Sequence, residues 1–158
     1  MGILTEDMKR VVRQQRLAFV ATVCADNTPN LSPKGTIAVW DDDHLVFANI
    51  RSPQTVANLR RNATVEINVV DPMARKGYRF KGTASVLESG ARHEEITAFF
   101  RALGVVNPFR EVVVVEVEQA LPVTSPAYDL GLTEAEVRER WERHYEALKH
   151  GSEEPTGE

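Results

Sequence analysis

Two short polar segments of this sequence carry residue types that could bind an anion. Ser32, Lys34 and Thr36 share one face of a predicted strand over residues 30–40, because side chains alternate along a strand. The segment 51–55 follows a predicted hairpin and reads Arg-Ser-Pro-Gln-Thr. We predict that these two segments together form a site for a phosphate-bearing cofactor.

The second of these segments has the pattern of a helix start. Ser52 is a common N-cap residue, and Pro53 suits the first helical position, where its missing N–H costs no hydrogen bond. The first amides of a helix are unpaired and carry partial positive charge, so phosphate binds there readily. Arg51 adds a planar fork of donors and Thr55 adds a hydroxyl, while Lys34 could reach in from the neighbouring strand.

The same residues also fit a plainer interpretation. In it, Ser52-Pro53 only begins a helix and Arg51 is solvated. Arg79 and Lys81 share one face of a later predicted strand, and that face either points at the site or is a solvated outer face. The sequence leaves both alternatives open.

The other chemistry-bearing residues form no recognised catalytic pattern. The four histidines are scattered, and no second histidine follows His93 at the spacing of a zinc protease, so we predict no metal site. No serine lies in a nucleophile elbow, and there is no Gly-x-Gly-x-x-Gly fingerprint. The one cysteine, Cys24, lies in an apolar run and is expected to be a buried, inert thiol. We assign no catalytic residue.

The composition excludes several classes of protein. A chain of 158 residues, 42% hydrophobic and 27% charged, is large enough for one domain with its own core, over residues 1–150. A net charge of −4 gives no basic field for nucleic acid or an anionic membrane. No apolar run is long enough to span a membrane, and the N-terminus lacks the apolar core of a signal peptide. With one cysteine and no internal disulfide possible, we expect a cytoplasmic protein.

Hydrophobic periodicity predicts a mainly β protein of the α+β class. Hairpin signals separate the strands, and the βαβ alternation of a parallel sheet is missing, so we expect an antiparallel β-barrel with peripheral helices. The segment 17–24 should be a well-buried strand, and 151–158 a disordered tail. Six strands are predicted, at 17–24, 30–40, 44–49, 64–70, 77–88 and 112–117, with helices at 6–15, 53–61, 91–103 and about 133–149.

A series of short motifs runs through residues 5–120. The motifs are Ser32-Pro33-Lys34-Gly35, Phe47-Ala48-Asn49, Arg51-Ser52-Pro53-Gln54-Thr55 before Asn58-Leu59, Asn62-Ala63-Thr64-Val65 and Phe80-Lys81-Gly82-Thr83-Ala84. In order and spacing they resemble the FMN-binding split-barrel family typified by pyridoxamine 5′-phosphate oxidase. The oxidase itself has an Arg-Lys pair where Gln54 and Thr55 stand here. The segment after Tyr128 instead looks like that of small, uncharacterised members.

The resemblance implies a six-stranded, Greek-key split β-barrel that forms a homodimer, with FMN in a cleft between the subunits. The resemblance implies that one group of residues lies beside the flavin ring and that a second group surrounds the ribityl chain and phosphate. It also implies that one further lysine adds positive charge to the site. The ring group is Ser32, Pro33, Lys34 and Gly35; the second group is Asn49, Arg51, Ser52, Gln54 and Thr55; the further lysine is Lys81.

The resemblance further implies an FMN-dependent oxidoreductase acting on a small molecule. One alternative is a deazaflavin (F420) reductase on the same barrel, whose longer anionic cofactor needs more basic residues at the mouth of the cleft. Arg60, Arg61, Arg75 and Lys76 leave this alternative open. A second alternative is a flavin-binding or sensing module without turnover. A heme-handling protein would need an axial ligand, and no histidine is placed to provide one.

Overall fold

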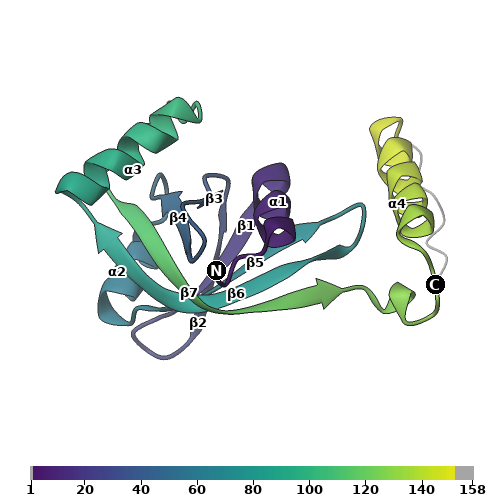
Figure 1. Ribbon diagram of the computed structural model, residues 1–158, viewed down its shortest axis with the longest axis horizontal. Coiled ribbons are helices and arrows are strands. Elements are labelled where there is room, and N and C mark those ends of the chain that lie inside the picture. The colour runs from purple at the N-terminus through teal and green to yellow at the C-terminus, as the bar shows by residue number, and fades with distance from the viewer. Residues whose placement is uncertain (1, 152–158) are drawn as a thin grey trace.

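One antiparallel sheet, curled into a half-barrel, forms the body of the molecule (Figure 1). The computed structural model describes residues 2–151. Within them the strand order is β2-β1-β5-β6-β7-β4-β3, and every paired neighbour is antiparallel. The strands are β1 (Ala18–Val23), β2 (Pro29–Lys34), β3 (Ala38–Val39), β4 (His44–Ala48), β5 (Thr64–Asp71), β6 (Lys76–Leu87) and β7 (Val112–Thr124). The helices are α1 (Glu6–Gln15), α2 (Pro53–Arg61), α3 (Ala91–Ala102) and α4 (Glu134–Lys149), with a 3-10 turn η1 (Pro126–Tyr128).

The described sheet has seven strands, so the predicted number of six is wrong, whereas the split-barrel class is confirmed. The difference arises in the segment 30–40, which the sequence predicts as one strand. The chain turns at Gly35 and Thr36, so that β2 pairs with β1 while β3 pairs with β4. These two short strands lie at opposite edges of the sheet. The crossing between the edges is what gives Lys34 and Gly35 their position beside a cavity.

Two apolar clusters hold the sheet and its helices together. The larger lies inside the curl and includes Val12, Phe47, Ile67 and Phe80. The smaller lies under α3 and is built by Ala38, Val46, Ala48, Ile96, Phe100, Val112 and Val114. Alternate valines of β7 enter different clusters, because successive side chains of a strand point to opposite faces. The valines of the run VVVVEV are therefore buried on both faces of the strand.

The outer face of β1 differs from the prediction. The segment was expected to be well buried, yet Phe19 is 43% exposed and the preceding Leu17 is 46% exposed. On the adjoining β2, Leu31 is 66% exposed and pairs with Ala21. An apolar strand sequence alone does not reveal whether one face or both are covered. Here only the face of Ala18 and Val20 is buried.

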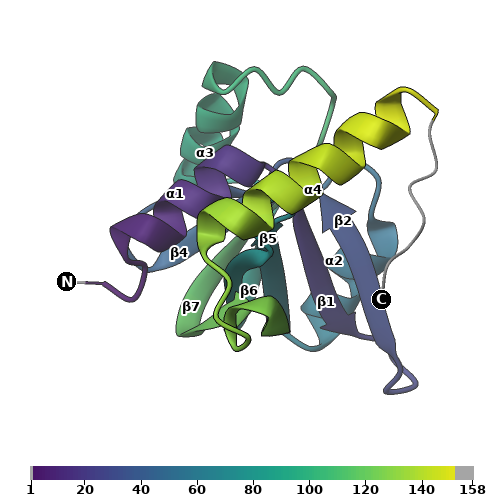
Figure 2. The same ribbon diagram turned by 90° about the vertical axis from the view of Figure 1, so that its right-hand side faces the viewer.

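The C-terminal helix stands at the end of an arm formed by β6 and β7, as Figures 1 and 2 show. Three contacts fix α4 to the turn between β5 and β6 and to the residues that flank it. Arg138 Nη2 lies 2.7 Å from Asp71 Oδ2, Lys76 Nζ lies 2.8 Å from Glu134 Oε2, and Arg75 stacks 3.4 Å from the ring centre of Trp141. Val137 of α4 is buried. Thr133 and Glu136 form a capping box at the start of α4. The predicted tail lies outside the described residues, apart from Gly151.

Candidate functional site

Lys34, the last residue of β2, is the centre of a buried polar cluster. Its side chain is buried, with 4% of the residue exposed. The Nζ atom lies 2.5 Å from Ser32 Oγ, 2.7 Å from Ser52 Oγ and 3.3 Å from the carbonyl oxygen of Pro33. The two serine hydroxyls also lie 3.2 Å from each other. The fold therefore brings the strand segment and the helix start together, as the sequence predicts.

The charge of Lys34 has no carboxylate partner among residues 2–151. All three acceptors around its Nζ are neutral, and the nearest ring is that of Phe47, 5.7 Å away. Burial disfavours the charged form and lowers the pKa of Lys34 to about 8. A buried ammonium without a counter-charge is costly unless an anion joins it. This arrangement is suited to binding an anion.

Ser52 occupies the N-cap position of α2 but does not cap the helix. Its hydroxyl contacts Lys34 and Ser32 and makes no hydrogen bond to the helix amides. Asn49 holds Ser52 in place instead: the Ser52 N–H donates to Asn49 Oδ1 at 3.0 Å, and Asn49 Nδ2 donates to Glu111 Oε2 at 3.2 Å. The first amides of α2 therefore lack the side-chain cap that the sequence predicts.

An unpartnered hydroxyl lies in the same turn of α2. Thr55 is 1% exposed, and its Oγ1 makes no hydrogen bond. Buried polar atoms in proteins nearly always have a partner, so such an atom calls for an explanation. A ligand with acceptor oxygens at the helix start would provide one. Uncapped amides and this hydroxyl form a donor set that suits phosphate.

A cavity of about 380 Å³ opens beside Lys34 and Ser52. Arg51 lines it, is exposed, and has no hydrogen-bond or ion-pair partner among residues 2–151. The lining residues are Pro33, Lys34, Gly35, Thr36, Ala48, Ile50, Arg51, Ser52, Gly104, Val105 and Asn107. Most of the residues predicted from the sequence therefore lie in the lining or directly behind it.

Two of the predicted site residues make other contacts. Gln54 Nε2 donates to Asn58 Oδ1 at 2.7 Å, and buried Asn58 donates in turn to Thr22 Oγ1 at 3.0 Å, which fixes α2 to β1. Lys81 lies on β6, 3.6 Å from Glu66, beside a different cavity. Within one chain the fold does not bring Lys81 to the cluster around Lys34.

A second cavity, of about 490 Å³, adjoins the first and was not predicted from the sequence. Arg13 and Arg16 from the end of α1 line it together with Trp40 and Phe99. One sequence signal could have indicated that the two arginines are unpaired. No acidic residue lies three or four positions before either arginine, or four positions after it, where an ion pair along the helix would form. Their place beside Trp40 depends on the packing of α1 against β3.

Among residues 2–151, no group of three or more His, Cys, Asp or Glu side chains is placed to hold a metal ion. The helices within the same residues are too short or too polar to cross a membrane.

Comparison with known proteins identifies the family. The family described as pyridoxamine 5′-phosphate oxidase matches residues 4–124, which is most of the chain. This chain belongs to the pyridoxamine 5′-phosphate oxidase family. The match agrees with the resemblance found over residues 5–120, and α4 lies beyond the matched residues. No curated protein sequence matches the chain.

Several solved structures share the fold of this chain. HupZ from Group A Streptococcus is 35% identical, with 77% of this chain and 94% of that chain covered and a TM-score of 0.70. An FMN-binding protein from Syntrophomonas wolfei is 19% identical, with 77% and 87% covered and a TM-score of 0.65. An F420 reductase is 20% identical, with 74% and 98% covered and a TM-score of 0.55. The last two show the common fold alone.

Proposed function

We propose that this protein binds FMN in the cavity beside Lys34 and acts as a flavin-dependent oxidoreductase on a small molecule. The observation that carries the proposal is the buried ammonium of Lys34, which has no carboxylate partner and lies at the uncapped start of α2. Membership of the pyridoxamine 5′-phosphate oxidase family supports a flavin as the anion.

The residues of the cavity fit the parts of FMN. The amides at the start of α2, the Thr55 hydroxyl and the Arg51 guanidinium supply donors for the phosphate. The backbone of Pro33 and Gly35 offers an open edge for the ring, since a Cβ on Gly35 would meet only the carbonyl oxygen of Arg16, at 3.9 Å. Asn49 positions Ser52 between the residues proposed for the phosphate and those proposed for the ring.

When bound, FMN supplies the redox chemistry. The contribution of the chain is positional and electrostatic. Lys34 would hold a positive charge beside the ring, where it would favour negative charge on the cofactor. Ser32 and Ser52 orient its Nζ, and burial keeps the charge poorly screened.

We further propose a homodimer with the cofactor cleft at the subunit interface. The exposed apolar side chains Leu17, Phe19 and Leu31 support a second copy covering the outer face of β1 and β2. Lys81 reaches a cofactor only in such an assembly, because within one chain it lies beside Glu66. We treat residues 1–150 as one FMN-binding domain, since α4 packs on the turn between β5 and β6.

The first alternative is binding of F420. The basic residues first considered for its longer anionic tail lie elsewhere: Arg60 pairs with Glu88, Arg75 stacks on Trp141, and Lys76 pairs with Glu134. Arg13 and Arg16, in the adjoining cavity, are the residues that favour this alternative. A flavin-binding module without turnover is the second alternative.

The deciding experiment is the visible spectrum of the purified protein with chromatographic identification of the released cofactor. Protein that emerges colourless is titrated with FMN and with F420. We expect a flavin spectrum, released FMN, and bleaching with NADH or NADPH. Preference for F420 would favour the first alternative, and bound FMN that no nicotinamide reduces would favour the second. Failure to bind either cofactor would overturn the proposal. Size-exclusion chromatography with light scattering tests the dimer.

A further inference from the structure

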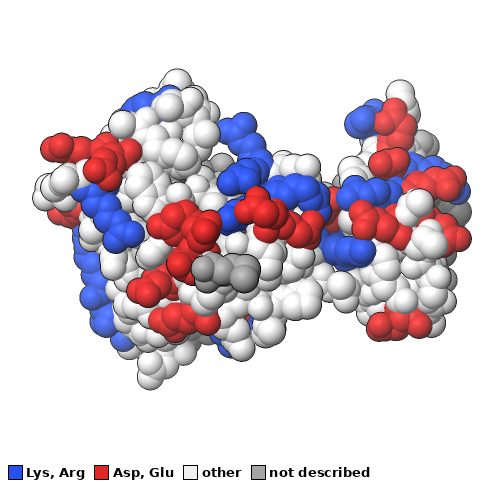
Figure 3. All heavy atoms as spheres, in the orientation of Figure 1, with Lys and Arg blue, Asp and Glu red and all other residues white. Residues whose placement is uncertain are grey.

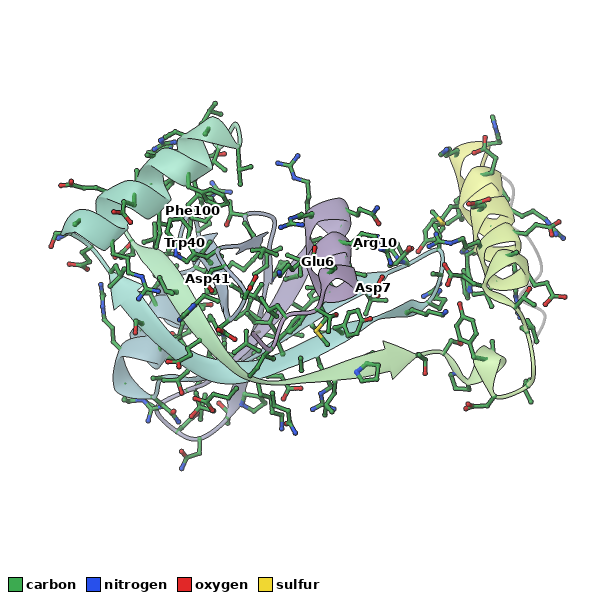
Figure 4. The ribbon with its side chains drawn as sticks, in the orientation of Figure 1. Glu6, Asp7, Arg10, Trp40, Asp41 and Phe100 are labelled. Atoms are coloured by element: carbon green, nitrogen blue, oxygen red, sulfur yellow. The ribbon has the colours of Figure 1, made fainter. Side chains whose placement is uncertain are left out.

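The second cavity adjoins the proposed cofactor cavity. Gly35, Thr36 and Val105 line both, so ligands in the two cavities would share these residues as neighbours. The second cavity lies between the end of α1, the segment 35–40 and α3. Figure 4 shows Trp40 and Phe100 together between α3 and the sheet. Both side chains line the second cavity.

The charges around this pair of cavities differ from those of the whole chain. The net charge is −4, yet no described Asp or Glu lines either cavity. Carboxylates line the other cavities described: Asp7, Asp71 and Glu134 in one, Glu66 and Glu118 in another, and Glu88 in a third. Figure 3 shows acidic and basic side chains mixed over the face in view, with basic ones at the upper margin between α3 and α1.

Arg13 and Arg16 are the charged residues of the second cavity. Neither has a hydrogen-bond or ion-pair partner for its guanidinium among residues 2–151. Nearby Lys9 and Arg10 of the same helix, by contrast, are paired with Glu6, Asp42 or Asp7. Two unpaired guanidinium groups that line one cavity are suited to binding a carboxylate, because each guanidinium can donate paired N–H hydrogen bonds to it.

The walls below these arginines are apolar and aromatic. Trp40 and Phe99 meet edge to face, with ring centres 5.5 Å apart, and Trp40 is only half-buried. Ile37, Val39 and Phe100 complete the wall. A ligand that fills this cavity therefore has an apolar or aromatic body and an acidic end.

We propose that the second cavity is the substrate site and that it takes an aromatic or apolar carboxylic acid. The carboxylate binds Arg13 and Arg16, and the body packs on Trp40 and Phe99. The substrate assignment rests on the proposed function, because it requires a flavin in the adjoining cavity. The binding of an acid in the second cavity does not depend on the proposed function, and it can be tested separately. The carboxylates of an F420 tail share this chemistry, so the test must separate the two sources.

The two tryptophans give the test an internal control. In the ¹H–¹⁵N NMR spectrum of the full chain, Trp40 and Trp141 give the two indole signals, and a Trp141→Phe variant assigns them. The probes are 2-naphthoate and its uncharged analogue 2-naphthamide. We expect 2-naphthoate to shift the Trp40 signal in a saturable way while the Trp141 signal stays in place. The amide should bind at least about tenfold more weakly, the scale of one lost charge-assisted contact.

Two charge-removing variants complete the design. Arg13→Gln combined with Arg16→Asn, where Asn tolerates the left-handed conformation of residue 16 (φ 50°), should weaken 2-naphthoate by at least about tenfold. Arg92→Gln is the matched control: Arg92 is exposed on α3, has no partner among the described residues and lines neither cavity. Equal binding of acid and amide, or an equal effect of Arg92→Gln, would overturn the proposal.

Cofactor titrations on the same proteins separate this proposal from the proposed function. If the protein binds FMN but does not bind 2-naphthoate, only the acid site is refuted. If it binds 2-naphthoate but does not bind FMN, only the flavin assignment is refuted. A third outcome is that the parent protein binds F420 but not 2-naphthoate, and that the double variant no longer binds F420. This outcome would assign the two arginines to the tail of the cofactor. That result would also overturn the substrate site.

Discussion

The Nζ atom of Lys34 lies 2.7 Å from the Oγ atom of Ser52, and this contact joins the end of β2 to the start of α2. It takes the Ser52 hydroxyl away from the helix amides, which consequently lack a side-chain cap. It also surrounds a buried ammonium with neutral acceptors only. In the free protein both features cost stability, and an anion at this position would relieve both.

Replacing Lys34 should stabilise the free protein and weaken cofactor binding. The pKa of Lys34 is lowered from 10.5 to about 8 by burial, so folding disfavours its charged form. The cost is complete below pH 8, where folded and unfolded chains are both protonated. It disappears as the pH rises from 8 to 10.5. Lys34→Met should therefore raise the free energy of unfolding at pH 7 by about 1–3 kcal/mol, since one pKa unit corresponds to about 1.4 kcal/mol.

Urea denaturation and FMN titration of the same variant provide the measurement. The control is Lys149→Met, which removes an exposed lysine from the last turn of α4. We expect little change in stability for the control, as for most surface substitutions. A Lys34→Met protein that is less stable than the parent would contradict the unpaired-charge interpretation. Unchanged FMN affinity and flavin reduction rates would remove Lys34 from the cofactor site.

Cofactor affinity should depend on pH through the same lysine. The ammonium form binds the anion, and in the free protein that form is lost as the pH rises through about 8. The dissociation constant of FMN should therefore be flat between pH 7 and 7.5 and rise above pH 8, approaching tenfold per pH unit. Flavin fluorescence quenching measures it across pH 7–10. A Lys34→Met protein should show no such rise, and a parent protein with a flat profile would refute the coupling.

Arg51 should contribute to affinity without contributing to stability. Its side chain is exposed and has no partner among the described residues, so its removal breaks no contact within the chain. Arg51→Ala should weaken FMN by about 1–3 kcal/mol, the scale of a charge-assisted hydrogen bond. Arg92→Ala removes an equally unpaired arginine far from the cavity and serves as the control. An unchanged dissociation constant in Arg51→Ala would exclude Arg51 from the site.

Two glycine substitutions should have opposite consequences. A Cβ on Gly35 has room within the chain, and residue 35 has no positive φ, so Gly35→Ala should fold with unchanged or slightly higher stability. Because Gly35 lines the proposed cofactor cavity, the added methyl group should reduce FMN affinity. A Cβ on Gly82 would collide with the carbonyl oxygen of Glu116 at the bulge in β6, so Gly82→Ala should lose about 1–3 kcal/mol.

Thermal melts and FMN titrations of both glycine variants check this contrast. The expected pattern is a stable Gly35→Ala protein with weak FMN binding and a destabilised Gly82→Ala protein. If Gly35→Ala binds FMN as tightly as the parent, the ring does not lie against this segment.

The sequence by itself determined the types and order of most elements, and the family, because these depend on local patterns. Thr5 caps α1 through a local contact, because its hydroxyl accepts a hydrogen bond from an amide three residues along the chain. The alternation of Val65, Ile67 and Val69 identified β5, and all three side chains are buried. The short motifs around Lys34 and Ser52 indicated an anion site without knowledge of the sheet.

Only the tertiary structure decided which side chains meet across the sheet. The break of the predicted strand 30–40 at Gly35 depends on the pairing of its two halves with different partners, β1 and β4. The hydroxyl of Ser52 leaves its own helix because Lys34, eighteen positions away, is a buried donor that needs acceptors. Arg13 and Arg16 face Trp40 because α1 packs over β3. Local periodicity carries no information about such long-range contacts, which the packing of the whole barrel determines.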